Sequence, residues 1–210
     1  MMKRPVAGTA LVLLGAVALA GCASSPPEHF YTLSGGPGPV AAPAPPQALP
    51  TPQLYVEVGA VSVPPQVSRN QLVVLTGSGV DILEQERWAG PLAAEIGQAL
   101  SLGITGTLGA IDVYHTPYPA QAPVYRISTS VQRFESAPGQ YALIDAVWSV
   151  RQLSSGTVLT CRTVARETVG SGYEALVAGH RLAVARVAAA VSTAIGKMAA
   201  GGDAACPASS

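Results

Sequence analysis

Alternating apolar and polar positions predict a series of β-strands along this chain. Short β-prone runs fall at residues 54–58, 71–76, 80–83 and 111–115, and three longer runs follow at 124–135, 140–153 and 157–169. The long runs are separated by the turn-forming segments Ala137-Pro138-Gly139 and Ser154-Ser155-Gly156. Because such short connections join neighbouring strands, we expect the three long strands to form an antiparallel meander.

Two other stretches have helical spacing. Residues 88–108 place Leu92, Ile96 and Leu100 on one face, with Pro91 in the first turn. Residues 172–200 form a second helix with a buried side made of Leu176, Ala183, Val187, Val191, Ala194 and Met198. This second helix has no uncharged run of 18 residues, so we predict that it does not cross a membrane.

The order of these elements predicts an α/β fold. Strands, a helix, further strands and a last helix are expected to form a sandwich with a mixed, largely antiparallel sheet and two main helices. We place this single domain at residues 54–200, with a C-terminal tail at 201–210. Gly77-Ser78-Gly79 is predicted to be a hairpin turn, because no lysine follows it as a phosphate-binding loop requires.

The first 21 residues have the pattern of a secretory signal. Lys3 and Arg4 precede a short apolar stretch, and Leu19-Ala20-Gly21-Cys22 ends it. The stretch is too short to span a bilayer as a helix. Cys22 matches the bacterial lipoprotein signal, in which the cysteine receives lipid and becomes the new N-terminus. We therefore predict lipidation, including palmitate, at Cys22. In enterobacterial lipoproteins, which this signal resembles, an aspartate after the cysteine favours the inner membrane, so the resemblance implies that Ala23 favours the outer membrane, with the domain facing the periplasm.

Residues 22–53 are predicted to be a lipid anchor and a linker rich in Pro, Gly and Ala. Within them, Phe30-Tyr31-Thr32-Leu33 is an apolar tetrad with β propensity. The sequence leaves two alternatives open. Either the tetrad docks on the domain as an edge strand and the linker is a surface loop, or the whole segment extends away from the membrane.

The charge and cysteine content of the chain limit the classes of function that it can have. The chain has 12 Lys and Arg against 12 Asp and Glu, with 49% hydrophobic and 11% charged residues. The sequence lacks a stripe of basic residues, which would indicate nucleic-acid binding. Apart from Cys22, only Cys161 and Cys206 remain, and because the periplasm is oxidising we predict that they form a disulfide.

We find no pattern that indicates catalysis or a metal site. His29, His115 and His180 have no shared spacing with other ligands and are interpreted as surface or half-buried residues. Asp81, Glu84 and Glu86 are interpreted as acids that precede a helix. Trp88, at the start of that helix, and Trp148, in a central strand, are interpreted mainly as core residues, with partner contact as the alternative.

Several motifs resemble the PqiC/YmbA-type lipoproteins, the auxiliary lipoproteins of MCE-type ABC transport systems. The similar segments are Tyr31-Thr32-Leu33, residues 58–64, Arg69-Asn70-Gln71-Leu72-Val73, residues 86–92, Phe134 and Ala146-Val147-Trp148. Two positions depart from the family pattern: Asn70 replaces a common proline and Gly90 replaces an acid. The resemblance covers nearly all of the mature chain.

This resemblance implies a three-layer α/β sandwich similar to anticodon-binding-like folds. It also implies a protein that is not an enzyme, carries no cofactor beyond the covalent lipid, and docks the MCE-domain protein of a permease and ATPase complex during lipid transport between membranes. Self-association into a homo-oligomer is a further implication. We place partner contact at Phe30, Tyr31, Thr32 and Leu33 and at the proline-rich loop 115–123. The alternative from another class is a stand-alone outer-membrane lipoprotein that acts as a structural tether or an envelope-assembly factor.

Overall fold

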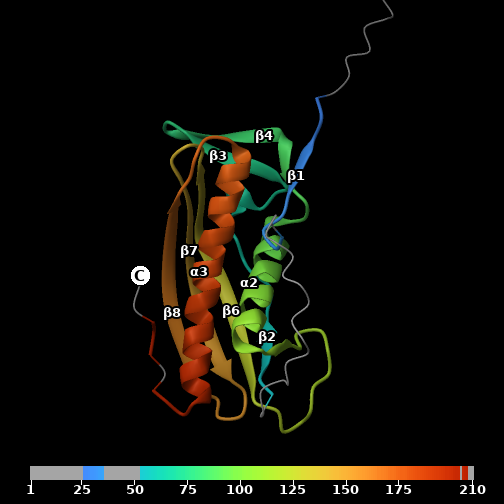
Figure 1. Cartoon of the computed structure of the whole chain (residues 1–210), viewed down its shortest axis with the longest axis vertical. Helices are drawn as coiled ribbons and strands as arrows, with labels where there is room; N and C mark the ends of the chain where they lie inside the picture. The colour runs from blue at the N-terminus through green and yellow to red at the C-terminus, as the bar shows by residue number, and fades with distance from the viewer. Residues whose placement is uncertain (1–25, 36–52, 204, 208–210) are drawn as a thin grey trace, which may run out of the picture.

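The computed structural model describes residues 26–35, 53–203 and 205–207. The predicted signal, Cys22 and most of the linker lie outside these residues. The described chain folds into two β-sheets and two long helices, as shown in Figure 1, and this confirms the predicted α/β sandwich. The division into two separate sheets was not predicted.

The large sheet has the strand order β5-β2-β6-β7-β8. Its strands are β2 (Tyr55–Val58), β5 (Ile111–Asp112), β6 (Val124–Ala137), β7 (Tyr141–Gln152) and β8 (Val158–Thr168). β6, β7 and β8 form the predicted antiparallel meander, whereas β2 pairs in parallel with β5 and β6. The predicted strand at 111–115 is only two residues long.

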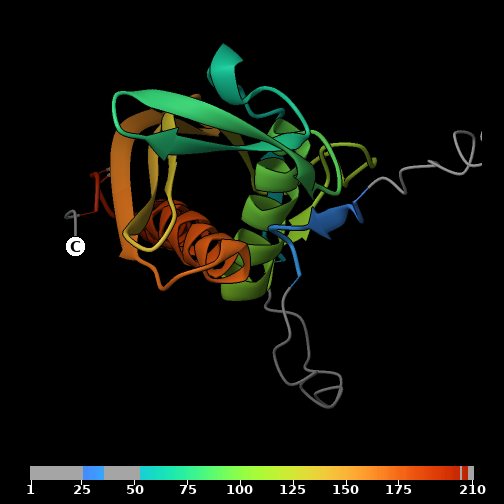
Figure 2. The ribbon, with the colours of Figure 1, turned by 90° about the horizontal axis from the view of Figure 1, so that it is seen from above.

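The small sheet has the order β1-β4-β3 and lies across one end of the large sheet and the helices, as Figure 2 shows from above. It consists of β1 (His29–Tyr31), β3 (Gln71–Thr76) and β4 (Gly79–Trp88), and a short 3-10 helix, η1 (Pro65–Val67), precedes β3. The predicted turn between β3 and β4 is present, with Gly77 in the left-handed region at φ 56°.

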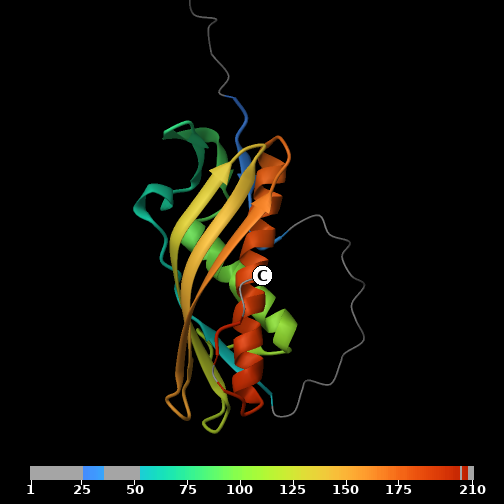
Figure 3. The same ribbon diagram turned by 90° about the vertical axis from the view of Figure 1, so that its left-hand side faces the viewer.

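Both helices cover one face of the large sheet, and Figure 3 shows α3 running along the twisted strands of the meander. α2 (Leu92–Leu108) and α3 (Tyr173–Ala199) bury Ile96, Leu100, Val187 and Val191. The two helices approach closely at Gly103, where an added Cβ would lie 2.8 Å from the Cβ of Ala188. Gly103 is therefore required for the close packing of the helices.

α3 is long and apolar enough to cross a membrane by length and composition alone, the one such helix in the part of the chain that the structure describes. Half of its most apolar window is buried inside the protein, which is typical of a core helix.

The start of α2 differs from the prediction. Trp88 ends strand β4 instead of opening the helix, which begins at Leu92. Asp81, Glu84 and Glu86 consequently lie in a strand and not directly in front of a helix, so their interpretation as acids that favour the helix dipole was wrong. Trp88 and Trp148 are both buried, at 3% and 1% exposure, which confirms that they are core residues.

Candidate functional site

An open groove of about 820 Å³ lies between α2 and one end of the large sheet. One wall is α2, through Ala93, Ala94 and Gly97, and the facing wall is the chain that follows β2 at residues 58–61. Asp112, at the end of β5, and residues 114–116, which lead into the proline-rich loop, close one side. The walls from α2 and from residues 58–61 are mainly small and apolar, and polar groups are contributed by Gln98, Ser101, Asp112, Tyr114, His115 and Thr116.

The side chain of Asp112 holds the walls of this groove together. Its Oδ2 accepts a hydrogen bond from the hydroxyl of Ser101 on α2 at 2.6 Å. Its Oδ1 accepts from the backbone N–H of Tyr114 at 3.0 Å and from that of Val58 at 3.4 Å. The carboxylate is thus occupied by bonds within the protein, and it fixes the helix relative to β2 and β5.

Small residues make the groove hollow. An added Cβ at Gly59 would lie 3.1 Å from the carbonyl oxygen of Ile127, and one at Gly97 would lie 3.6 Å from Cγ2 of Val61. The groove was not identified from the sequence, because its walls come from three distant segments. The only local signal was the set of small residues Ala93, Ala94 and Gly97 in the first turns of the predicted helix.

The tetrad predicted to contact a partner is docked on the domain. β1 pairs in parallel with β4, with Phe30 opposite Arg87 and Tyr31 opposite Trp88. The structure therefore resolves the two alternatives that the sequence left open in favour of docking. Leu33 is buried in the core, whereas Phe30 is 61% exposed.

Two glutamates hold this docked segment. The hydroxyl of Tyr31 donates to Oε2 of Glu86 at 2.6 Å, and Nδ1 of His29 lies 2.9 Å from Oε1 of Glu86. Oε2 of Glu95 on α2 accepts from the Thr32 hydroxyl at 2.7 Å and from the Leu33 N–H at 2.8 Å.

A further contact comes from α3, where Nε of Arg181 donates to the carbonyl oxygen of Thr32 at 2.9 Å. Residues 28–34 are called the docked segment below. Of the four residues predicted to contact a partner, only Phe30 leaves most of its surface free, and the contact itself stays a prediction.

Hydrogen bonding shifts the pKa values at the docked segment. Burial by itself raises the pKa of Glu86, but the hydrogen bonds from Tyr31 and His29 outweigh it and bring the pKa below its usual value. Burial and the bond to Glu86 raise the pKa of the Tyr31 hydroxyl well above its usual range. Glu86 is therefore ionised and Tyr31 is a neutral donor at neutral pH.

The three histidines lie in different surroundings. His29 is in the docked segment, and His115 lies at the margin of the groove beside Tyr114. His180 is fully buried, and the interpretation of it as a surface or half-buried residue was wrong. Its ring stacks on Phe134 with centroids 4.0 Å apart, and its Nε2 lies 2.8 Å from the hydroxyl oxygen of Ser136.

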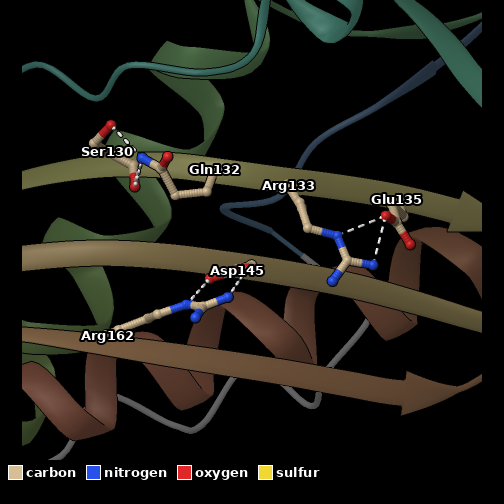
Figure 4. A network of polar contacts seen from close by, with 6 residues as sticks. All are labelled: Ser130, Gln132, Arg133, Glu135, Asp145 and Arg162. Carbon is tan, nitrogen blue, oxygen red and sulfur yellow. Dashed lines mark hydrogen bonds and ion pairs between the residues drawn. The ribbon is translucent and has the colours of Figure 1, made fainter.

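The face of the large sheet opposite the helices carries polar pairs, which Figure 4 shows from close by. Arg162 on β8 donates two hydrogen bonds to Asp145 on β7, at 2.8 and 2.6 Å, and these bonds lower the pKa of Asp145. Arg133 pairs with Glu135 along β6 at 2.7 Å, and Nε2 of Gln132, at a β-bulge, donates to Oγ of Ser130 at 2.9 Å. Two of these pairs join opposite charges and the third joins two neutral polar groups, so each group has a partner within the sheet.

Cys161 and Cys206 form a disulfide across 45 positions of sequence, which links β8 to the C-terminal tail. Across residues 26–35, 53–203 and 205–207, no three His, Cys, Asp or Glu side chains gather closely enough to hold a metal ion. Cys22 lies outside the described residues, so its lipidation stays a prediction.

The fold is a mixed α/β sandwich that other solved structures share at low sequence identity. One is the crystal structure of an uncharacterized protein, 18% identical, with a TM-score of 0.61, covering 81% of this chain and 99% of its own. Another is protein XCC0632 from Xanthomonas campestris, of family DUF330, 19% identical, with a TM-score of 0.55, covering 71% of this chain and 88% of its own. A PelC dodecamer from Paraburkholderia phytofirmans has a TM-score of only 0.38 at 11% identity, with 64% of this chain and 84% of its own covered.

In sequence, residues 31–192 match the family described as the ABC-type transport auxiliary lipoprotein component. The chain therefore belongs to that family, as the resemblance to PqiC/YmbA-type lipoproteins predicted. No curated protein matches the chain in sequence.

Proposed function

We propose that this chain is a periplasmic lipoprotein, anchored in the outer membrane by lipid on Cys22, that docks the periplasm-spanning MCE component of an ABC-type transport system. Such a complex moves lipids between the two membranes. Membership of the transport auxiliary family supports the link to an ABC system. The signal-like start and Cys22 support the anchor, and self-association into a homo-oligomer is part of the same proposal.

The observation that carries the docking role is the open apolar groove beside α2. Its small side chains leave room for side chains of a partner, and the buried centre of a protein interface is typically apolar. Asp112 already binds Ser101 and two backbone N–H groups, so the walls are fixed before a partner arrives. A preformed site loses less conformational entropy when it binds a partner.

The proposal is tested by crosslinking and affinity purification of the lipidated protein from membranes, followed by mass spectrometry. We expect recovery of an MCE-domain protein from the unmodified chain and its loss from the variant Ala94→Glu. Ala94 is exposed in the first turns of α2, where an acid is compatible with the helix, so the variant should fold normally.

Leu102→Glu is the matched control, because Leu102 is exposed on the same helix but outside the groove. If the Ala94→Glu variant still recovers the MCE-domain protein, the groove is not the site at which this partner binds. Recovery of only outer-membrane or cell-wall partners would favour the tether instead. Deletion of residues 22–33 is a poorer test, since Leu33 belongs to the hydrophobic core.

A further inference from the structure

Strand β4 of the β3–β4 hairpin presents two exposed aliphatic side chains, Val80 and Ile82. Leu75 pairs with Val80 and Val73 pairs with Ile82, so these four side chains share one face of the hairpin, here called the outward face, although Val73 itself is buried in the core cluster. Leu72 and Leu83, paired on the other face, contact the core. On the outward face Val80 is 49% exposed and Ile82 is 42% exposed.

The docked segment enters at the same end of the molecule. Figure 1 shows β1 beside β4 at the end capped by the small sheet, and the described chain starts there. Phe30 adds an exposed aromatic ring at this end. The small sheet thus combines exposed apolar side chains with the point where the chain arrives from Cys22.

The length of chain between Cys22 and the domain limits how far this end can lie from the lipid. Residues 23–25 are all that separate Cys22 from Pro26, and at about 3.5 Å per residue the distance from Cys22 to Pro26 is at most about 14 Å. Glu86 and Glu95 hold the docked segment on the domain through hydrogen bonds, so this segment cannot detach and increase the distance between the domain and the lipid. The small sheet is consequently held close to the membrane surface.

We infer that the exposed apolar side chains of the small sheet, Val80 and Ile82 on β4 and Phe30 on β1, rest on the lipid surface and orient the domain on the membrane. This inference rests on the proposed anchor at Cys22. Apolar side chains at a membrane surface enter the boundary between headgroups and acyl chains.

Charge at this end indicates apolar rather than electrostatic contact. Glu28, Asp81 and Glu84 accompany Arg69 and Arg87, and no basic excess is present among these residues. Attraction to anionic lipid requires a cluster of Lys and Arg. Contact should therefore be the same on zwitterionic and on anionic vesicles.

The inference is tested with the full lipidated chain in phosphatidylcholine vesicles that contain brominated lipid, which quenches nearby tryptophan. Phe30→Trp and Ile82→Trp place reporters on the proposed face, while the native Trp88 and Trp148 are buried and give a constant background. Val158→Trp is the matched control, because Val158 is 44% exposed in a strand of the large sheet. We expect brominated lipid to reduce the fluorescence of Phe30→Trp and Ile82→Trp, and to leave that of Val158→Trp unchanged.

A second variant, Val80→Thr with Ile82→Thr in the Phe30→Trp background, keeps β propensity and removes apolar surface, so quenching should fall. Quenching of neither reporter in vesicle-bound protein, or equal quenching of Val158→Trp, would overturn the inference and leave the anchor intact. Protein that does not stay with vesicles at all would overturn the anchor and, with it, the inference. Crosslinking of the hairpin to a second copy without quenching would assign the patch to self-association instead.

Discussion

At the scale of single residues, the buried side chain of His180 makes the stability of the folded protein depend on pH. The imidazole is fully buried between Phe134 and Trp88, and only one ring nitrogen has a partner, the Ser136 hydroxyl. Burial lowers the pKa of His180 from 6.5 to about 3, because the charged form has lost its hydration. The folded protein thus keeps this ring neutral at pH values where the unfolded chain protonates it.

We predict that His180 makes the folded state less stable in mild acid. Below pH 6.5 the unfolded chain binds a proton that the folded chain does not, so the free energy of unfolding falls as the pH decreases towards 3. The contribution is about 1.4 kcal/mol per pH unit. Urea unfolding between about pH 7 and pH 4 measures it.

His180→Phe should flatten that slope, while the loss of the Ser136 partner lowers stability by about 1–2 kcal/mol at every pH. The exposed His115, replaced by Phe, is the control and should leave the slope as it is. Equal slopes in the original chain and in His180→Phe would show that this histidine is not the acid-sensitive group.

The burial of His180 could not be predicted from the sequence. Helical spacing places it in α3, but the ring is enclosed by β6 and β4, whose contacting residues are distant in the chain. Trp148, by contrast, was correctly interpreted, because a tryptophan within a long apolar strand has few alternatives to burial.

At the scale of elements, Glu95 connects the docked segment to α2. One carboxylate oxygen accepts two hydrogen bonds from Thr32 and Leu33. Bonds to a charged group are each worth about 1.5–3 kcal/mol. The position of β1 therefore depends on a side chain that lies more than sixty residues away.

We predict that Glu95→Ala loosens the docked segment. Loss of about 1.5 kcal/mol corresponds to roughly tenfold faster hydrogen exchange at the Leu33 amide, measured by mass spectrometry. Glu84→Gln is the control, since the Glu84 side chain is 63% exposed and makes only long contacts. An unchanged exchange rate at Leu33 in Glu95→Ala would mean that β-pairing with β4 alone holds the segment.

Elements with long local patterns were predicted well, and those that depend on distant pairing were not. The meander β6–β8 and helix α3 have sustained periodicity and short connections, which the sequence displays directly. The second half of β4, from Glu84 to Arg87, is polar and is held as a strand by β1 and by residue Gln71. For the same reason the groove, whose walls meet only after folding, was missed.

At the scale of the whole molecule, the disulfide joins the two ends of a long stretch of chain. The loop between Cys161 and Cys206 contains the rest of β8 and all of α3. Closing a loop of this length restricts the unfolded chain, which stabilises the folded state by up to about 4 kcal/mol.

We predict that Cys161→Ser with Cys206→Ser lowers the free energy of unfolding by about 2–4 kcal/mol and retains the fold. Urea unfolding followed by circular dichroism measures the loss. Adding reductant to the unmodified chain should reproduce the loss, and reductant should have no effect on the double variant. Equal stability of the oxidised and reduced chains would contradict a stabilising role.

The same bond also influences how copies of the protein meet. β8 is the last strand of its sheet, and an uncovered strand edge offers free backbone groups to any other chain. Cys206 keeps the tail beside this edge, with its sulfur 3.4 Å from the carbonyl oxygen of Thr160. We therefore expect the oxidised chain to keep its tail at the start of this edge, and the reduced chain to leave that part of the edge more open to strand addition.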